Sequence, residues 1–308
     1  MSLRAPRRRD RVVLSTVREP ALTAVYGLGW ATTKRLPEGV ARAVFDHVGT
    51  RIYRRGGPSV ARLRGNLSRA VPQARSGELD ELTHRAVRSY LRYWCETFRL
   101  PVWSHEEVVE RVRTVDEHYL RDAYAGGRGA IVPLPHTANW DHAGAWACLT
   151  GMPLTTVAER LEPERLFRQF VDYRVSLGME VLALTGGESV FPTMIDRLRQ
   201  GRLVCLVADR DLSSTGVEVN LLGEPARLPG GPAALSRMTG SPLVPSTLSY
   251  EPARTVLRFY PPVEVRRGRE GVAAMTQEVA DAFTTGIRAH PVDWHMMQRI
   301  FVSDLMAT

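Results

Sequence analysis

The sequence predicts an α/β protein: a single domain with a central mixed, mostly parallel sheet flanked by helices, plus a helical N-terminal subdomain. Three observations lead to this class. From residue 113 onward, short β-rich apolar runs alternate with helical ones, as in sheets covered on both faces. Residues 20–100 instead show the spacing of successive amphipathic helices. Apolar residues make up 44% of the chain and charged residues 24%, which is ordinary for a globular protein with a sizeable core.

Three helix signals occur in the N-terminal part. Pro37 marks one helix start, Ser59 is expected to cap a second helix running through residues 60–70, and residues 76–100 form a long amphipathic pattern. We therefore expect a helical region ahead of the sheet.

Positive charge is concentrated in the same part of the chain. Residues 1–70 hold fifteen Arg or Lys and four Asp or Glu, a local net charge of +11, whereas the whole chain carries +8. A surface of this sign favours anionic phosphates. We take residues 1–112 as a basic, helical region facing an anionic membrane surface. Nucleic acid is the other common anionic partner of a basic surface, but no sequence motif for nucleic-acid binding accompanies the charge.

An apolar stretch at residues 21–33 is too short to cross a bilayer, which takes about 20 residues. It is either a helix lying on a membrane or one packed on the protein body, and both readings stay open. The three cysteines lie in apolar segments without a CxxC pair, which indicates a reducing compartment. We expect a peripheral protein at the cytoplasmic face of the cell membrane.

Residues 113–308 are expected to form the catalytic α/β core. Its strands are predicted at residues 129–134, 154–158, 179–184, 203–208, 217–222, 242–250 and 255–265. Its helices are predicted at residues 139–150, 163–177, 189–200, 231–239 and 271–289.

The stretch "IVPLPHTANWDHAGAW" places His136 where an apolar strand turns into a helix that begins at Asn139 or Trp140. Asp141 then lies in the first turn of that helix. A carboxylate beside one imidazole nitrogen fixes the tautomer and leaves the other nitrogen free to take a proton. Two other readings remain: a buried, inert histidine, and a metal site using His136, Asp141 and His142.

Two further polar turns follow predicted strands, "VAER" after residue 156 and "ADRD" after residue 207. In sheets of this kind, ligands bind beyond the carboxyl ends of the strands. We therefore expect these turns and His136 to share one rim.

Several ordered segments together carry a family resemblance: "LPHTANWDHAGAW", "TTVAERLEPERLFRQFVDYRVSLGMEVL", "CLVADRDLSSTGVEVNLLGEPARLPGGPAAL" and "HPVDWHMMQ". The chain resembles the actinobacterial phosphatidylinositol mannoside acyltransferases and, more distantly, the lauroyl acyltransferases of lipid A biosynthesis. The resemblance implies a glycerol-phosphate-acyltransferase-like fold, an HxxxxD site, and acyl transfer from acyl-CoA to a mannose hydroxyl of a membrane glycolipid.

Carried over by position, the resemblance makes His136 the general base and Asp141 the motif carboxylate. The family's partner acid is a glutamate, and Asp209 stands in its place here, shorter by one methylene. If Asp209 orients His136, its shorter side chain must reach the ring through a shift of its turn or through a water. Which of the two acids orients His136 stays open.

The resemblance also implies the substrate-binding residues. Arg174 and Thr215 match positions near the acyl-CoA, and Glu159 and Arg160 match residues that line the site. Arg210 and Arg227 are added as candidates because guanidinium forks bind phosphate oxygens bidentately.

The expected reaction needs neither a metal nor a resident cofactor, since a thioester is already activated. The expected partners are acyl-CoA, with palmitoyl-CoA as the donor, and a mannosylated phosphatidylinositol. Three alternatives remain: an acyltransferase for another lipid acceptor, a catalytically silent membrane-binding protein, and a metal-dependent phosphoesterase.

Overall fold

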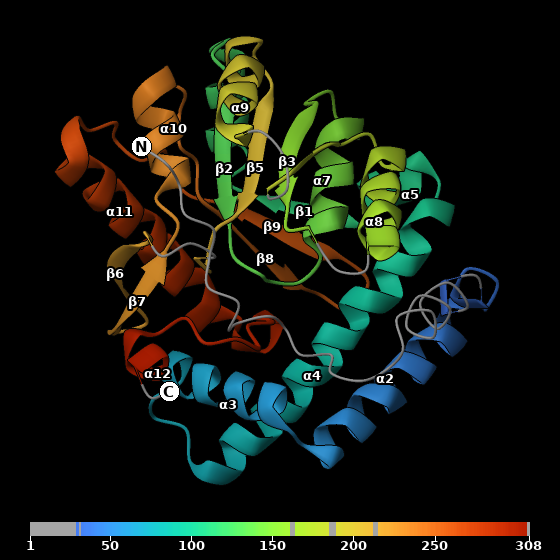
Figure 1. The fold of residues 1–308 in the computed structure, drawn as a ribbon. Helices are drawn as coiled ribbons and strands as arrows, with labels where there is room; N and C mark the ends of the chain where they lie inside the picture. Colours follow the sequence, from blue (N-terminus) through green and yellow to red (C-terminus); the bar gives the residue numbers. More distant parts are fainter. Residues whose placement is uncertain (1–28, 31, 161–163, 185–188, 212–214, 307–308) are drawn as a thin grey trace.

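The computed structural model describes residues 29–30, 32–160, 164–184, 189–211 and 215–306, and it has the predicted α/β architecture (Figure 1). The helices are α2 (Glu38–Arg55), α3 (Pro58–Ala70), α4 (Ser76–Arg99), η1 (Leu100–Val102), α5 (His105–Glu110), α6 (His118–Ala125), α7 (Trp140–Leu149), α8 (Glu164–Ser176), α9 (Val190–Arg199), α10 (Gly231–Thr239), α11 (Gly268–Ala289), η2 (Pro291–Asp293) and α12 (Val302–Met306). The strands are β1 (Val112–Val115), β2 (Ala130–Leu134), β3 (Leu154–Ala158), β4 (Glu180–Ala183), β5 (Leu203–Val207), β6 (Val217–Leu221), β7 (Glu224–Leu228), β8 (Ser246–Tyr250) and β9 (Thr255–Phe259).

The central sheet is parallel and has the strand order β2-β5-β3-β4. A second sheet, β1-β9-β8, pairs β1 with β9 in parallel and β9 with β8 antiparallel. The backbone of Ile131 joins β2 to the segment just before β8, because its N–H donates to Pro242 and its carbonyl accepts from Val244. The strands β6 and β7 form a separate antiparallel hairpin. The sheet arrangement is therefore mixed and mostly parallel, as predicted.

Alternate residues of the central strands face opposite sides of the sheet. Ile131 of β2 and Val204 of β5 belong to one core cluster, together with side chains of α9, α10 and α11. Val132 of β2 and Leu203 of β5 belong to another cluster, which includes side chains of α7. This alternation is the pleat of a strand that is buried on both faces. It explains why β2 and β5 read as continuous apolar runs.

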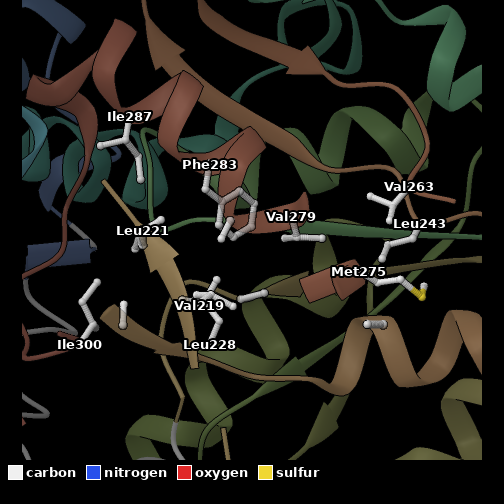
Figure 2. Close-up of a cluster of buried hydrophobic side chains, with 14 of the residues drawn as sticks. Val219, Leu221, Leu228, Leu243, Val263, Met275, Val279, Phe283, Ile287 and Ile300 are labelled. Carbon is white, nitrogen blue, oxygen red and sulfur yellow. The ribbon is translucent and has the colours of Figure 1, made fainter. Parts of the chain in front are cut away.

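The first of these clusters extends from the sheet to the β6–β7 hairpin. Figure 2 shows Val279 and Phe283 of α11 directed towards Val219 and Leu221 of β6. Trp294, just beyond η2, is fully buried in the same cluster. The segment after α11 is thereby fixed against the body of the protein.

The helices α2, α3 and α4 lie together beside the strands (Figure 1). Gly49 lets α2 approach α4 closely, since a Cβ there would lie 3.2 Å from the Cα of Arg88. Asn66 of α3 donates to the backbone carbonyls of Met296 and Gln298. These contacts attach the helical region to the rest of the fold, and α4 brings side chains to the site described below. The division between residues 112 and 113 stays a prediction.

The structure departs from the sequence-based expectations in two places. Ser59 is not the cap of α3, because the helix begins at Pro58 with Gly57 at the N-cap and no side-chain cap bond. Proline favours the first position of a helix, and this preference explains why α3 begins at Pro58. The elements α5, β1 and α6 were not predicted.

The apolar stretch at residues 21–33 lies mostly outside the described residues. Within the described ranges, no helix combines the length and the apolar character that crossing a bilayer requires.

Candidate active site

Three neighbouring parallel strands end at the same edge of the central sheet. β2 ends at Leu134, β5 at Val207 and β3 at Ala158. The polar turns that follow them contact one another: His136 contacts Asp209, and Glu159 forms an ion pair with Arg210 at 2.7 Å. The rim predicted from the sequence is present.

His136 and Asp209 form a tightly held pair. Nδ1 of His136 lies 2.5 Å from Oδ1 of Asp209, and the backbone N–H of His136 donates to Oδ2 at 2.9 Å. Asp209 is fully buried, whereas 31% of the His136 side chain is exposed. No shift of the turn and no water is needed for the shorter carboxylate to reach the ring.

The charge state of Asp209 fixes the tautomer of His136. Burial alone would raise the pKa of Asp209, but the His136 ring, the Trp294 indole N–H and the His136 backbone N–H outweigh it and lower the pKa. An ionised carboxylate only accepts hydrogen bonds, so Nδ1 of His136 carries the proton. Nε2 of the neutral ring is then an acceptor, and the described part of the chain gives it no hydrogen-bond partner.

Asp141 faces away from the His136 ring. Asn139 caps α7 by accepting from the backbone N–H of His142 at 3.0 Å. Asp141, in the first turn, accepts from Nε of Arg174 at 2.7 Å and from the hydroxyl of Tyr93 at 3.0 Å. Of the two acids considered from the sequence, it is Asp209 that contacts His136.

Arg174 is a largely buried cation. Its side chain is 17% exposed and that of Asp141 only 2%, and this pairing outweighs burial and raises the pKa of the guanidinium. Arg174, Asp141 and Trp140 line a cavity of about 80 Å³ whose remaining lining is mostly apolar, including Leu154 and Met179. Trp140 also packs edge-on against His136, with ring centroids 5.4 Å apart. Trp140 therefore contacts the imidazole of His136 and also lines the apolar cavity.

The other predicted substrate-binding residues lie farther apart. Arg160 pairs with Glu164 of α8 at 2.7 Å. Thr215 is exposed just before β6. Arg227 is exposed on β7, and no contact between described residues joins it to His136, Asp209 or Arg174. The structure thus brings Arg210 and Glu159 to the rim and leaves Arg227 on the hairpin.

The two ring nitrogens of His142 are both engaged by other groups. Nδ1 lies 3.0 Å from the hydroxyl of Thr255, and Nε2 lies 2.8 Å from the carbonyl of Val108. The ring of His142 is therefore directed away from His136. A metal site using His136, Asp141 and His142 does not fit this arrangement.

Sequence reasoning missed two residues of the site. Trp294 donates its indole N–H to Oδ2 of Asp209 at 3.0 Å, and Tyr93, in the middle of α4, donates to Asp141. The backbone N–H of His295, which follows Trp294 in the chain, donates to the carbonyl of His136. The signal for Trp294 was its place in the "HPVDWHMMQ" segment, which carries part of the family resemblance.

Residues 14–303 match the family described as bacterial lipid A biosynthesis acyltransferase. The chain belongs to this family. It is 43% identical to the phosphatidylinositol mannoside acyltransferase of Mycolicibacterium smegmatis over 281 residues, which is 91% of each chain. It is also 43% identical to the protein of the same name from Mycobacterium tuberculosis over 294 residues, covering 94% of this chain and 92% of that protein. The resemblance stated from the sequence motifs is confirmed.

Proposed function

We propose that this acyltransferase moves a fatty acyl group from acyl-CoA to a mannose hydroxyl of a phosphatidylinositol mannoside, with His136 as the general base. The observation that carries the proposal is the His136–Asp209 pair, in which Nδ1 faces the buried carboxylate and Nε2 belongs to a ring that is 31% exposed at the sheet edge. The names of two relatives at 43% identity support the acceptor.

The proposed reaction is a direct transfer. Nε2 of His136 takes the proton of the sugar hydroxyl while the hydroxyl oxygen attacks the thioester carbon. The buried carboxylate of Asp209 stabilises the imidazolium that forms. Collapse of the tetrahedral intermediate breaks the carbon–sulfur bond, and the proton on His136 passes to the leaving thiolate. No covalent acyl-enzyme is needed.

The acyl chain is proposed to enter the apolar cavity beside Trp140. Arg174 lies at the polar part of its lining, held there by Asp141, and its remaining N–H donors suit a thioester oxygen that gains negative charge. A cavity of about 80 Å³ holds only about three groups the size of a water. A long chain such as palmitoyl is larger than this cavity, so it extends beyond the cavity or the lining opens to admit it.

The test is acyl transfer by the purified protein from radiolabelled palmitoyl-CoA. Phosphatidylinositol mannoside and unmannosylated phosphatidylinositol would be offered side by side as acceptors. The proposal expects a labelled product from the mannosylated lipid only. Labelling of phosphatidylinositol alone would assign a different acceptor, and absence of any labelled lipid product would contradict acyl-CoA-dependent transfer.

We also propose that α2 holds the protein on an anionic membrane. Four apolar side chains at i+4 spacing form a stripe along its outer face, each between 40% and 48% exposed: Val40, Val44, Val48 and Ile52. Arg51, Arg54 and Arg55 lie on the same helix. An apolar helix face with basic neighbours is the composition of an interfacial helix.

Replacing Val44 and Val48 with Asp is expected to release the protein from membranes. Each valine would lose roughly 1.5–3 kcal/mol of apolar burial in the bilayer, so the partition coefficient should fall at least about tenfold. The measurement is sedimentation with vesicles containing phosphatidylinositol, at low and high salt. Val265→Asp is the matched control, because Val265 is equally exposed at 43% but lies outside α2. Equal sedimentation of the double variant and the control would refute the membrane role of α2.

A further inference from the structure

The segment after α11 forms a backbone support beneath the His136 turn. The carbonyl of Asp293 accepts from the N–H of Ala138, and the N–H of His295 donates to the carbonyl of His136 at 2.8 Å. Thr137 and Trp294 form an isolated antiparallel bridge between these two hydrogen bonds. The strand-like pairing holds both ends of the turn that presents the imidazole.

Side chains of the same segment are joined to α4. Ser89 donates its only hydroxyl proton to Oδ1 of Asp293 at 2.7 Å, and Nε2 of His295 lies 3.1 Å from the Ser89 oxygen. Because that proton is already used, Nε2 of His295 is the donor in the second contact. Burial and the nearby His136 lower the pKa of His295 to about 3, so the ring is neutral at pH 7. The His295 ring of this segment therefore adds no positive charge beside His136.

Trp294 is the one residue of this segment whose side chain reaches the catalytic pair. Its indole N–H donates to Oδ2 of Asp209, the oxygen that also accepts from the His136 backbone. Oδ1 is left for the His136 ring. The indole is fully buried among the side chains of the main core cluster, so its N–H cannot turn towards water.

We propose that Trp294 is a positioning residue for acyl transfer, which fixes the rotation of the Asp209 carboxylate so that Oδ1 faces Nδ1 of His136. The proposal rests on His136 being the base. Trp103 gives the comparison: its side chain is half-buried, and its buried indole nitrogen has no hydrogen-bond partner among the described residues. In Trp294 the N–H is directed instead at the acid that orients the base.

The Trp294 N–H has a second consequence, because it stabilises the ionised form of Asp209. Among the described residues, the titratable groups that interact with this carboxylate are His136 and the neutral His295, and the guanidinium of the adjacent Arg210 is paired with Glu159. Removing the N–H raises the pKa of Asp209, so the carboxylate takes up a proton at a higher pH. As the pH is lowered, activity that needs ionised Asp209 therefore begins to fall at a higher pH in the variant than in the wild type.

The experiment compares Trp294→Phe with Trp103→Phe, which removes an indole N–H that has no partner in the described ranges of the chain. Trp294→Phe is expected to lower kcat about tenfold, the effect of one hydrogen bond to a charged group, with little change in KM for acyl-CoA. The acid limb of the kcat/KM profile is expected to move to higher pH. Trp103→Phe should change neither quantity.

The hydrogen bond itself is tested without activity. The Nδ1 proton of His136 should give a downfield NMR resonance, which is expected to shift or broaden in Trp294→Phe and to stay in place in Trp103→Phe. An unmoved resonance together with an unmoved acid limb overturns the proposal, even if kcat falls along with Tm, because that pattern describes core packing alone. If His136→Ala retained turnover, the proposed base would fail, and the resonance would still decide whether Trp294 positions Asp209.

Discussion

The His136→Ala variant is expected to fold, to bind acyl-CoA, and to transfer acyl groups ~10²–10⁴-fold more slowly than the wild type. The imidazole is 31% exposed and forms no part of the buried core, so its removal should leave the fold intact. What is lost is Nε2, the acceptor for the hydroxyl proton. The measurement is kcat with labelled acyl-CoA beside a calorimetric Kd for acyl-CoA.

The control for this variant is His118→Ala, since His118 is an exposed histidine at the start of α6. It should retain wild-type turnover. A folded His136→Ala protein that turns over at near-normal rates would remove His136 from the mechanism.

The second large effect is expected at Asp209, and it should differ in kind from that at Asp141. In Asp209→Asn, the amide can present its NH₂ group to Nδ1 of His136 and so impose the opposite tautomer, with the proton on Nε2. A histidine base that loses its carboxylate in this way slows by up to ~10⁴-fold in hydrolases. We expect kcat to fall by about 10²–10⁴-fold, with the acyl-CoA Kd unchanged. Asp209→Glu keeps the charge and restores the family's residue, so it should retain most of the turnover.

Asp141→Asn is the matched variant at the other acid. It leaves the buried Arg174 guanidinium without its counter-ion, and breaking a buried pair costs about 3–5 kcal/mol. We therefore expect a lower Tm and weaker acyl-CoA binding from Asp141→Asn, neither of which Asp209→Asn should show. Full activity in Asp209→Asn with collapse only in Asp141→Asn would show that Asp209 does not orient the base.

The sequence predicted the strands and helices that carry strong periodicity. The runs at β2 and β5 are apolar because side chains on both faces of these strands pack in core clusters, and this apolar character predicted the two strands. The elements α5 and β1 escaped prediction because each is short and mostly polar or half-exposed. Their stability comes from neighbours distant in the chain, such as the pairing of β1 with β9.

The part of the candidate site that follows the ends of the strands could be predicted from the sequence. His136 and Asp209 meet because β2 and β5 are adjacent and parallel. The partner of Asp141 was not predictable, since local spacing placed it near His136. The Asn139 cap starts α7 in an orientation that turns Asp141 towards Tyr93 and Arg174. The contact of Trp294 with Asp209 was not predicted, because it joins residues 85 positions apart in the sequence.

The most direct test of the account is a crystal structure with a non-hydrolysable acyl-CoA analogue. The account predicts that the acyl chain fills the apolar cavity lined by Leu154 and Met179. It places the thioester carbonyl between Arg174 and the Nε2 side of His136, with room for one hydroxyl oxygen at about 3–3.5 Å from the carbonyl carbon. An acyl chain bound elsewhere, or a carbonyl on the Asp209 side of the ring, would contradict it.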